Sequence, residues 1–144
     1  MPAFARFHAR ACPDSQLSLP LYVSRVPAGF PSAADNFSDQ RIDFNELLIR
    51  REEQCFCVQV QGNSMQGVGI FSGDLLVVDR SLIARPGDIV VAAINDEALV
   101  KELIQQDGLH YLKSHHPDYP PIAIAGDNDV SIWGVVCHCI HSLR

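Results

Sequence analysis

From residue 55 to the C-terminus, apolar residues come in short runs separated by turn-forming residues, and this spacing limits the fold more than any other feature. In the first run, Phe56, Val58 and Val60 alternate with Cys and Gln residues, which places these three side chains on one face of a strand. The later runs are strand-sized and begin or end near Gly, Pro, Asn or Asp: 75–78, 89–94, 99–104, 109–112, 122–125 and 132–140. Several short strands with almost no helix predict a mainly β domain of packed or partly closed sheets.

The same turn-to-strand sequence occurs twice within this region. Gly73-Asp74 precedes the apolar run 75–78, and Gly87-Asp88 precedes the run 89–94. Because Gly and Asp both favour turns, we expect the same local structure at both positions.

The part of the chain before residue 55 has a different pattern. The first 40 residues have neither a helical nor a strand period and contain five prolines, so we expect an extended arm. A single short helix is expected over residues 44–50. Asp43 can cap it, Glu46 stands three residues later as in a capping box, and Ile42 and Leu47 are placed for a hydrophobic staple.

Length and charge exclude several classes of protein. A chain of 144 residues is about one domain long. Its formal net charge is −6, with +2 on residues 1–28 and −8 on residues 29–144, which argues against a binder that coats nucleic acid with a basic surface. No apolar run approaches the roughly 18 residues of a membrane span, and no secretory signal is recognisable. Five cysteines without an export signal predict free thiols in a reducing cytoplasm.

Lys101 is unusual because it is one of only two lysines and falls within an apolar run. Alternation places it on the same face as Leu99 and Leu103. Burial would lower the pKa of its amine and leave a neutral base near pH 7. In the alternative, the stem packs at an edge strand while the ammonium reaches water, and the sequence leaves both possibilities open.

The motif Gly62-Asn63-Ser64-Met65 directly follows the first predicted strand and leads into a glycine-rich stretch. A serine at a tight strand-to-turn junction can present its hydroxyl while backbone N–H groups converge on one point, as in an oxyanion hole. A plain β-turn rich in Gly, Asn and Ser is the alternative. Neither the phosphate-loop nor the dinucleotide-binding motif fits this glycine spacing.

A third feature, Ala28-Gly29, lies in a proline-flanked part of the arm that is sterically open enough to enter a narrow groove. Alone, this dipeptide carries no weight. In their order along the chain, however, these motifs resemble the UmuD family of self-cleaving proteins, which is related to the peptidase domains of LexA and phage repressors. The resemblance covers about residues 22–144 and includes the 37-residue separation of Ser64 and Lys101. The motifs that carry it are Ala28-Gly29-Phe30-Pro31-Ser32, Arg41-Ile42-Asp43, Gly62-Asn63-Ser64-Met65, residues 72–79, Gly87-Asp88-Ile89-Val90, Val100-Lys101 and Trp133-Gly134-Val135-Val136.

The resemblance implies a fold and a domain organisation. The fold would be the mainly β, LexA/UmuD-like peptidase fold of short, strongly bent antiparallel sheets, with an extended N-terminal arm and one short helix. Residues 1–28 would be an arm that self-cleavage removes, and residues 29–54 a flexible segment with the short helix. Residues 55–144 would form the β catalytic and dimerisation domain.

The resemblance also implies catalytic roles. Ser64 would be the nucleophile, Lys101 the general base, and Ala28-Gly29 the bond that is cleaved, with no cofactor and no metal. Backbone N–H groups of Gly62, Asn63 and Ser64 are the candidates for stabilising the oxyanion.

The biological setting implied by the resemblance is the cytoplasmic SOS response. The RecA–single-stranded-DNA filament would stimulate cleavage, and the processed homodimer would serve an error-prone, UmuC-like Y-family translesion polymerase, without a membrane and without strong direct DNA binding. Two alternatives are a non-catalytic dimeric module that regulates a polymerase and a LexA-like repressor fragment. The 28 residues before the bond are too few for a helix-turn-helix domain, which argues against repression.

The cysteines and histidines offer a competing prediction. Cys55-Phe56-Cys57 and Cys137-His138-Cys139 could be assembled with His115, His116 and His141 into a zinc site. The more specific Cys-x-x-Cys spacing is absent, however, and cysteines two apart on a strand face the same side, where small apolar side chains are expected. We therefore favour packing of these cysteines in the core.

Overall fold

The computed structural model describes residues 18–21, 28–29, 40–126 and 128–144. The chain divides into two units. The described parts of the smaller unit are residues 18–21, 28–29 and 40–50, and those of the larger unit are residues 51–126 and 128–144. The rest of the predicted N-terminal arm, including its three arginines, lies outside the described residues.

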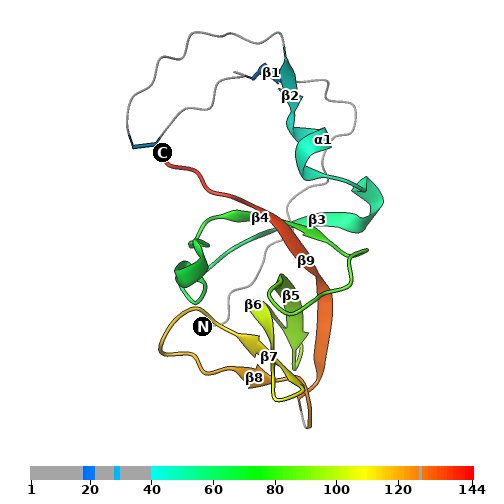
Figure 1. Ribbon diagram of the computed structural model, residues 1–144, viewed down its shortest axis with the longest axis vertical. Helices are drawn as coiled ribbons and strands as arrows, with labels where there is room; N and C mark the ends of the chain where they lie inside the picture. Colours follow the sequence, from blue (N-terminus) through cyan, green and yellow to red (C-terminus); the bar gives the residue numbers. More distant parts are fainter. Residues whose placement is uncertain (1–17, 22–27, 30–39, 127) are drawn as a thin grey trace. The chain divides into compact units, whose positions relative to one another are not determined.

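The described part of the larger unit forms one seven-stranded sheet in the order β3-β4-β9-β5-β6-β7-β8, with every neighbouring pair antiparallel (Figure 1). This result confirms the predicted mainly β fold, and each predicted apolar run overlaps a strand. Two short 3-10 helices, η1 at Glu52–Gln54 and η2 at Gln66–Val68, accompany the strands. The strands are β3 Cys55–Gln59, β4 Leu75–Asp79, β5 Ile89–Ile94, β6 Glu97–Gln106, β7 Leu109–Lys113, β8 Ile122–Ala123 and β9 Val130–Ile140.

Two tight hairpins set the register of β5, β6 and β7. The first turn is Asn95-Asp96, with φ values of 48° and 67°, and the second is Asp107-Gly108, with φ values of 52° and 77°. Positive φ at both central residues matches the right-handed twist of antiparallel strands, and Asn, Asp and Gly adopt it most readily. The first hairpin pairs Lys101 with Val90.

The repeated Gly-Asp dipeptides form the same turn twice, as the sequence predicts. Gly73 and Gly87 have φ values of 94° and 98°. Each following aspartate accepts a hydrogen bond from the backbone N–H three residues earlier, from Phe71 to Asp74 at 2.8 Å and from Arg85 to Asp88 at 2.9 Å. Both turns therefore lead directly into buried strands, β4 and β5.

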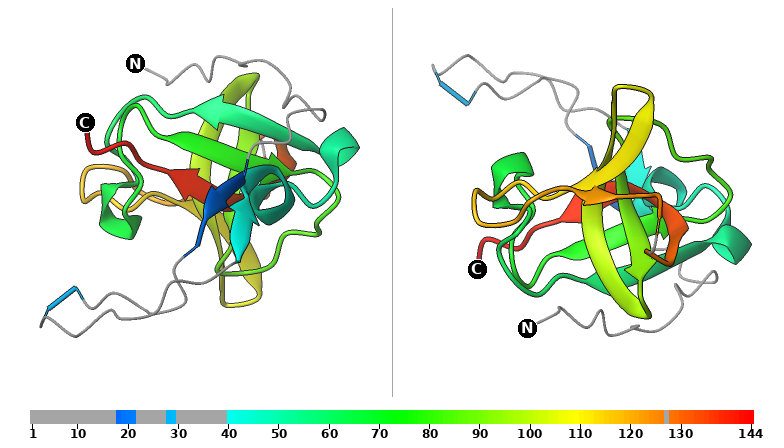
Figure 2. Two further views of the ribbon diagram at one scale, coloured as in Figure 1. Left: turned by 90° about the horizontal axis from the view of Figure 1, so that it is seen from above. Right: turned by 90° about the horizontal axis from the view of Figure 1, so that it is seen from below.

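The sheet is strongly bent, and irregularities in β9 accompany this bend. Its pairing register shifts once against β4 and once against β5, as expected where a bulge adds an unpaired residue. As a result, β3 and β4 run across the direction of β6 and β7 (Figure 2). Gly134 lies between the two shifts, where a Cβ would be 2.7 Å from Val78 Cγ1 and 2.9 Å from the Asp79 carbonyl oxygen.

All but one of the buried apolar residues described in this unit fall into two clusters, the exception being Val77. One contains Val58, Val60, Met65, Ile70, Leu76, Val78 and Val91. The other contains Val90, Ala92, Ile94, Leu103, Leu112 and Val135. The serine motif ends with a member of the first cluster, Met65, and β6 contributes Leu103 to the second, so both candidate catalytic segments are anchored in the core.

The smaller unit contains the predicted helix, but the helix is shorter than predicted. Asp43 caps α1, Phe44–Leu48, by accepting a hydrogen bond from Asn45 N–H at 2.8 Å. The helix ends at Leu48 instead of residue 50 because Ile49, a β-branched residue, is extended.

A short strand also interrupts the segment that was predicted to be an extended arm. Strand β1, Ser18–Pro20, pairs with β2, Arg41–Asp43. The Arg41 guanidinium donates to the Ser18 hydroxyl at 2.8 Å and to the Ser18 carbonyl at 2.6 Å. Three residues are too few to show an alternating pattern in the sequence. Among the described helices, none is long and apolar enough to cross a membrane.

Candidate active site

Ser64 lies on the loop between β3 and β4. The two ends of this loop are joined by hydrogen bonds from Val60 N–H to the Asp74 carbonyl at 2.8 Å and from Gly73 N–H to the Val60 carbonyl at 2.7 Å. Gly62 has a φ of 101°, a backbone conformation that glycine adopts without strain. The next residue after Ser64, Met65, is only 2% exposed. Ser64 itself is half-buried, so the loop fixes its backbone while part of the residue remains accessible.

Lys101 is buried in the middle of β6. It is 6% exposed, and it lies on the strand face that also carries Leu99 and Leu103. Burial lowers the pKa of its amine because the charged form loses hydration. Of the two possibilities that the sequence left open, the structure therefore supports the buried lysine over the lysine whose ammonium reaches water.

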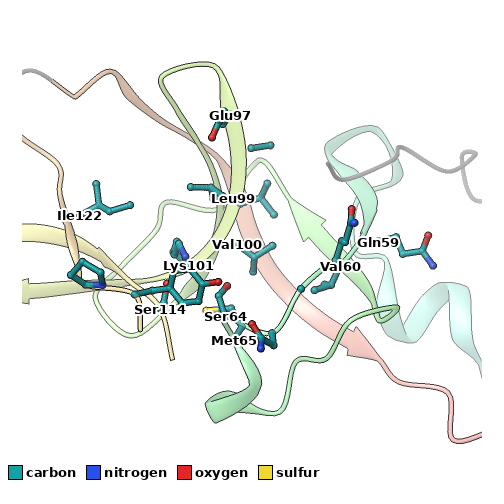
Figure 3. A pocket seen from close by; sticks show the side chains of 17 residues that line it. Gln59, Val60, Ser64, Met65, Glu97, Leu99, Val100, Lys101, Ser114 and Ile122 are labelled. Carbon is teal, nitrogen blue, oxygen red and sulfur yellow. Dashed lines mark hydrogen bonds between the residues drawn. The ribbon is translucent and has the colours of Figure 1, made fainter. Parts of the chain in front are cut away.

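Ser64 and Lys101 line the same cavity, which has a volume of about 420 Å³. Figure 3 shows both side chains gathered with Ser114 at one end of this cavity. Apolar residues, among them Leu99, Val100 and Ile122, cover much of the remaining lining. A hydroxyl and a largely desolvated amine are thus presented to an apolar cavity, which is the arrangement needed for nucleophilic attack assisted by a general base.

Two residues that no sequence motif identifies also lie beside the lysine, Ser114 and Tyr119. Lys101 Nζ donates a hydrogen bond to the hydroxyl of Ser114, which is 4% exposed. The Tyr119 ring centroid lies 5.5 Å from Lys101 Nζ. Both residues follow β7 in the chain and come beside Lys101 because β7 pairs with β6. No motif in the sequence marks this proximity.

The backbone groups suggested for the oxyanion hole are not equivalent. Gly62 N–H donates a hydrogen bond to the Ser72 hydroxyl at 3.2 Å, so this donor is occupied within the loop. The N–H groups of Asn63 and Ser64 are therefore the better candidates of the three.

Ala28 and Gly29, the predicted cleavage site, belong to the smaller unit. Both are exposed and lie in a bend. A Cβ added to Gly29 would meet no atom within 4 Å, so this glycine is sterically open as predicted, although the backbone bends here where an extended segment was expected. The flanking residues Pro27 and Phe30 lie outside the described residues.

The cysteines and histidines do not assemble into a zinc site where the structure describes them. No group of three His, Cys, Asp or Glu side chains within the described ranges could hold a metal ion. Cys55 and Cys57 are partly buried, and burial raises the pKa of the Cys57 thiol. Cys137 and Cys139 are exposed on β9, so the predicted packing of these cysteines in the core is wrong for this pair. Desolvation, together with the Asp74 carboxylate 3.3 Å from its sulfur, raises the pKa of Cys139 to about 11.

Asp74 connects the end of the serine loop to the C-terminal part of the chain. Its carboxylate is 3% exposed and accepts hydrogen bonds from Phe71 N–H at 2.8 Å and from His141 Nδ1 at 2.5 Å, with Cys139 as a third donor. Burial alone would raise the pKa of this carboxyl, but these hydrogen bonds outweigh it and hold the pKa below its usual value.

Comparison with known proteins agrees with a peptidase fold. The Peptidase S24-like family matches residues 20–137. Protein MucA of Salmonella typhimurium is 41% identical over 124 residues, which cover 85% of this chain and 84% of MucA. Protein ImpA of the same organism is 37% identical over 142 residues, covering 96% of this chain and 95% of ImpA. LexA repressor 2 of Xanthomonas campestris pv. campestris is 41% identical over 149 residues, covering 99% of this chain and 68% of the repressor.

These matches and the fold define the class of protein as a serine peptidase of the LexA/UmuD type. The chain belongs to the Peptidase S24 family, whose members include self-cleaving proteins of the SOS response.

Proposed function

We propose that this chain is a UmuD-like peptidase that cleaves its own Ala28-Gly29 bond through a Ser64-Lys101 dyad. The observation that carries the proposal is the shared cavity, in which a half-buried serine and a lysine that is 6% exposed meet an apolar lining. Membership of the S24 family supports a peptidase reaction at this site.

The first half of the reaction transfers the acyl group to the serine. Neutral Lys101 takes the Ser64 hydroxyl proton while the oxygen forms a bond to the Ala28 carbonyl carbon. The resulting oxyanion is stabilised by backbone N–H groups of Asn63 and Ser64. When the intermediate collapses, the bond to the Gly29 nitrogen breaks, and the Lys101 ammonium returns its proton to that amine.

The second half of the reaction releases the serine. Lys101, neutral again, removes a proton from water as the water oxygen attacks the Ala28 acyl carbon. Collapse of this second intermediate breaks the ester bond, and Lys101 returns the proton to the Ser64 oxygen. The products are a carboxylate on Ala28 and an amine on Gly29.

The cavity and the chain length are both compatible with this substrate. Ala28 has a small side chain and Gly29 has none, so the bond can enter a narrow site. The segment from Gly29 to Ser64 spans 35 residues, about 115 Å if fully extended. Cleavage within one chain and cleavage of a partner chain are therefore both within reach.

Cleavage would change the charge of the protein as well as its length. Removal of residues 1–28 takes away a net charge of +2 and leaves −8 on residues 29–144. We propose that residues 55–144 form the catalytic and dimerisation domain, and that residues 29–54 form a flexible segment that precedes it in the chain. The processed homodimer would then present an altered surface to a Y-family translesion polymerase, as the resemblance to UmuD implies, and the RecA filament would stimulate cleavage.

The test is intact mass spectrometry of the purified protein at about pH 10, where even an ordinary lysine begins to lose its proton. We expect loss of residues 1–28 in the wild type and no loss in Ser64→Ala or Lys101→Ala. A parallel incubation near neutral pH with a RecA–single-stranded-DNA filament should accelerate the same cleavage. An unchanged mass at every pH and with the filament would overturn the peptidase proposal and favour a non-catalytic binding module.

A further inference from the structure

The two residues after β7, Ser114 and His115, contact both members of the proposed dyad. The Ser114 hydroxyl accepts a hydrogen bond from Lys101 Nζ. The backbone N–H of the next residue, His115, donates to the Ser64 carbonyl at 2.7 Å. One dipeptide therefore touches the side chain of the proposed base and the backbone of the proposed nucleophile. Figure 3 shows the Ser114 side chain of this dipeptide beside Lys101.

This dipeptide is itself held from two further directions. The His115 side chain pairs with Glu102, the neighbour of Lys101 on β6. The His115 carbonyl accepts a hydrogen bond from Gly67 N–H, on the helix that follows Ser64, at 3.2 Å. Contact at Gly67 is so close that a Cβ there would be 2.9 Å from His115 Cβ and 3.0 Å from the His115 carbonyl oxygen. The dipeptide thus links the loop of Ser64 to the strand of Lys101.

The chemistry of a hydroxyl suits contact with a lysine that must change its charge. A neutral amine has two N–H donors and one lone pair, so donating one N–H to Ser114 limits the directions in which the lone pair can point. The same hydroxyl can still accept a hydrogen bond after the amine gains a proton. A carboxylate in this position would stabilise the charged ammonium and keep the base protonated. The neutral hydroxyl oxygen of Ser114 stabilises the ammonium much less.

We propose that Ser114 is a positioning residue for the dyad, which orients the Lys101 amine toward Ser64, while the His115 backbone fixes the loop that carries the serine. This inference rests on the proposed self-cleavage. It explains why a polar side chain with 4% exposure lies against a buried amine at the end of an apolar cavity.

The experiment measures the first-order rate of self-cleavage of the full chain between pH 7 and 11, by intact mass, for wild type, Ser114→Ala, Ser114→Cys and Ser114→Thr. Ser142→Ala, a change at an exposed serine outside the strands, is the matched control. Thermal unfolding of each variant gives the folded fraction, so that rates refer to folded protein.

We expect Ser114→Ala and Ser114→Cys to lower the plateau rate at least about tenfold, because alanine removes the acceptor and a thiol is a weak one. The midpoint of the pH profile should move to lower pH, since the Lys101 ammonium loses a hydrogen bond that favours it. Ser114→Thr should restore most of the rate, and Ser142→Ala should match the wild type. All variants keep the other titratable groups near the amine. These groups are Tyr119, the Glu102–His115 pair and Glu97, which lines the same cavity.

Three results would count against the inference, and they are distinguishable. If the wild type cleaves but folded Ser114→Ala has the same plateau and midpoint, the positioning role is wrong while the proposed function stands. If the wild type stays intact at every pH, both fall together. A loss of stability in Ser114→Ala without any change in the rate of its folded fraction would show a purely structural role and would also overturn the inference.

Discussion

The burial of Lys101 should make the stability of the protein depend on alkaline pH in a way that Lys101→Met removes. In the folded state the pKa of this amine lies below its usual value of 10.5 because burial disfavours the charged form. The unfolded chain therefore binds more protons between the folded pKa and 10.5, and wild-type stability rises with pH in that window. Below the folded pKa the cost of burying the charge is present in full.

The size of the effect follows from the linkage relation. A folded pKa lowered by one unit costs about 1.4 kcal/mol at neutral pH, and about 1 kcal/mol of this is recovered by pH 10.5. Methionine has a similar shape to lysine and no charge, so the unfolding free energy of Lys101→Met should not show this rise between neutral pH and pH 10.5. Loss of the hydrogen bond to Ser114 opposes the gain from removing the charge, and the change with pH is therefore more diagnostic than the difference at a single pH.

The assay is urea denaturation from pH 7 to 10.5, with Ser64→Ala in every protein so that the chain stays intact. Lys113→Met is the matched control, because this lysine is exposed on the neighbouring strand β7. The unfolding free energy of Lys101→Met minus that of its parent should fall as the pH rises across this range, because only the parent gains stability when the lysine loses its proton. A difference that stays constant, or that changes no more than for Lys113→Met, would refute a buried lysine with a lowered pKa.

Two other substitutions test the fold around the site. Gly134→Ala should lower the free energy of unfolding by about 1–3 kcal/mol in urea titrations, because its Cβ would be 2.7 Å from Val78 Cγ1, and an unchanged midpoint would contradict the packing at this position. Asp74→Asn should cost about 1–3 kcal/mol at pH 7, since the amide no longer offers a charged acceptor to Phe71 N–H and His141. The folded pKa of Asp74 is lowered from 3.8, so its contribution is present above pH 3.8 and lost as the pH falls through the folded pKa. Acid titration of the unfolding free energy should therefore show a smaller loss in Asp74→Asn than in wild type, and equal losses would contradict the role of this carboxylate.

Local patterns in the sequence were enough to predict most of the strands and the strand face on which Lys101 lies, but they left open whether its amine is buried. Alternation in the run around Lys101 reflects a strand with one face against the core, and the structure places Leu99, Lys101 and Leu103 on that face. The Gly-Asp turns were predictable for the same reason, because their hydrogen bonds join residues only three apart.

Contacts between distant segments could not be predicted in this way. Ser114 reaches Lys101 only because the Asp107-Gly108 turn sets the register of β6 and β7, and neither residue's neighbours in the sequence reveal the pairing. The hydrogen bond that Gly62 N–H donates is accepted by the hydroxyl of Ser72, at the far end of the serine loop. The strand at Ser18–Pro20 depends on pairing with Arg41–Asp43, more than 20 residues away along the chain.

The most direct test of the central claim is the pH dependence of wild-type self-cleavage, followed by intact mass and by sequencing of the new N-terminus. We predict a fragment that begins at Gly29, with a rate that rises with pH and levels off below 10.5, because a lysine with a lowered pKa must be neutral to accept the Ser64 proton. Ser64→Ala should give no fragment at any pH. A rate that does not change with pH, a fragment that begins elsewhere, or cleavage in Ser64→Ala would contradict self-cleavage of Ala28-Gly29 by the Ser64-Lys101 dyad.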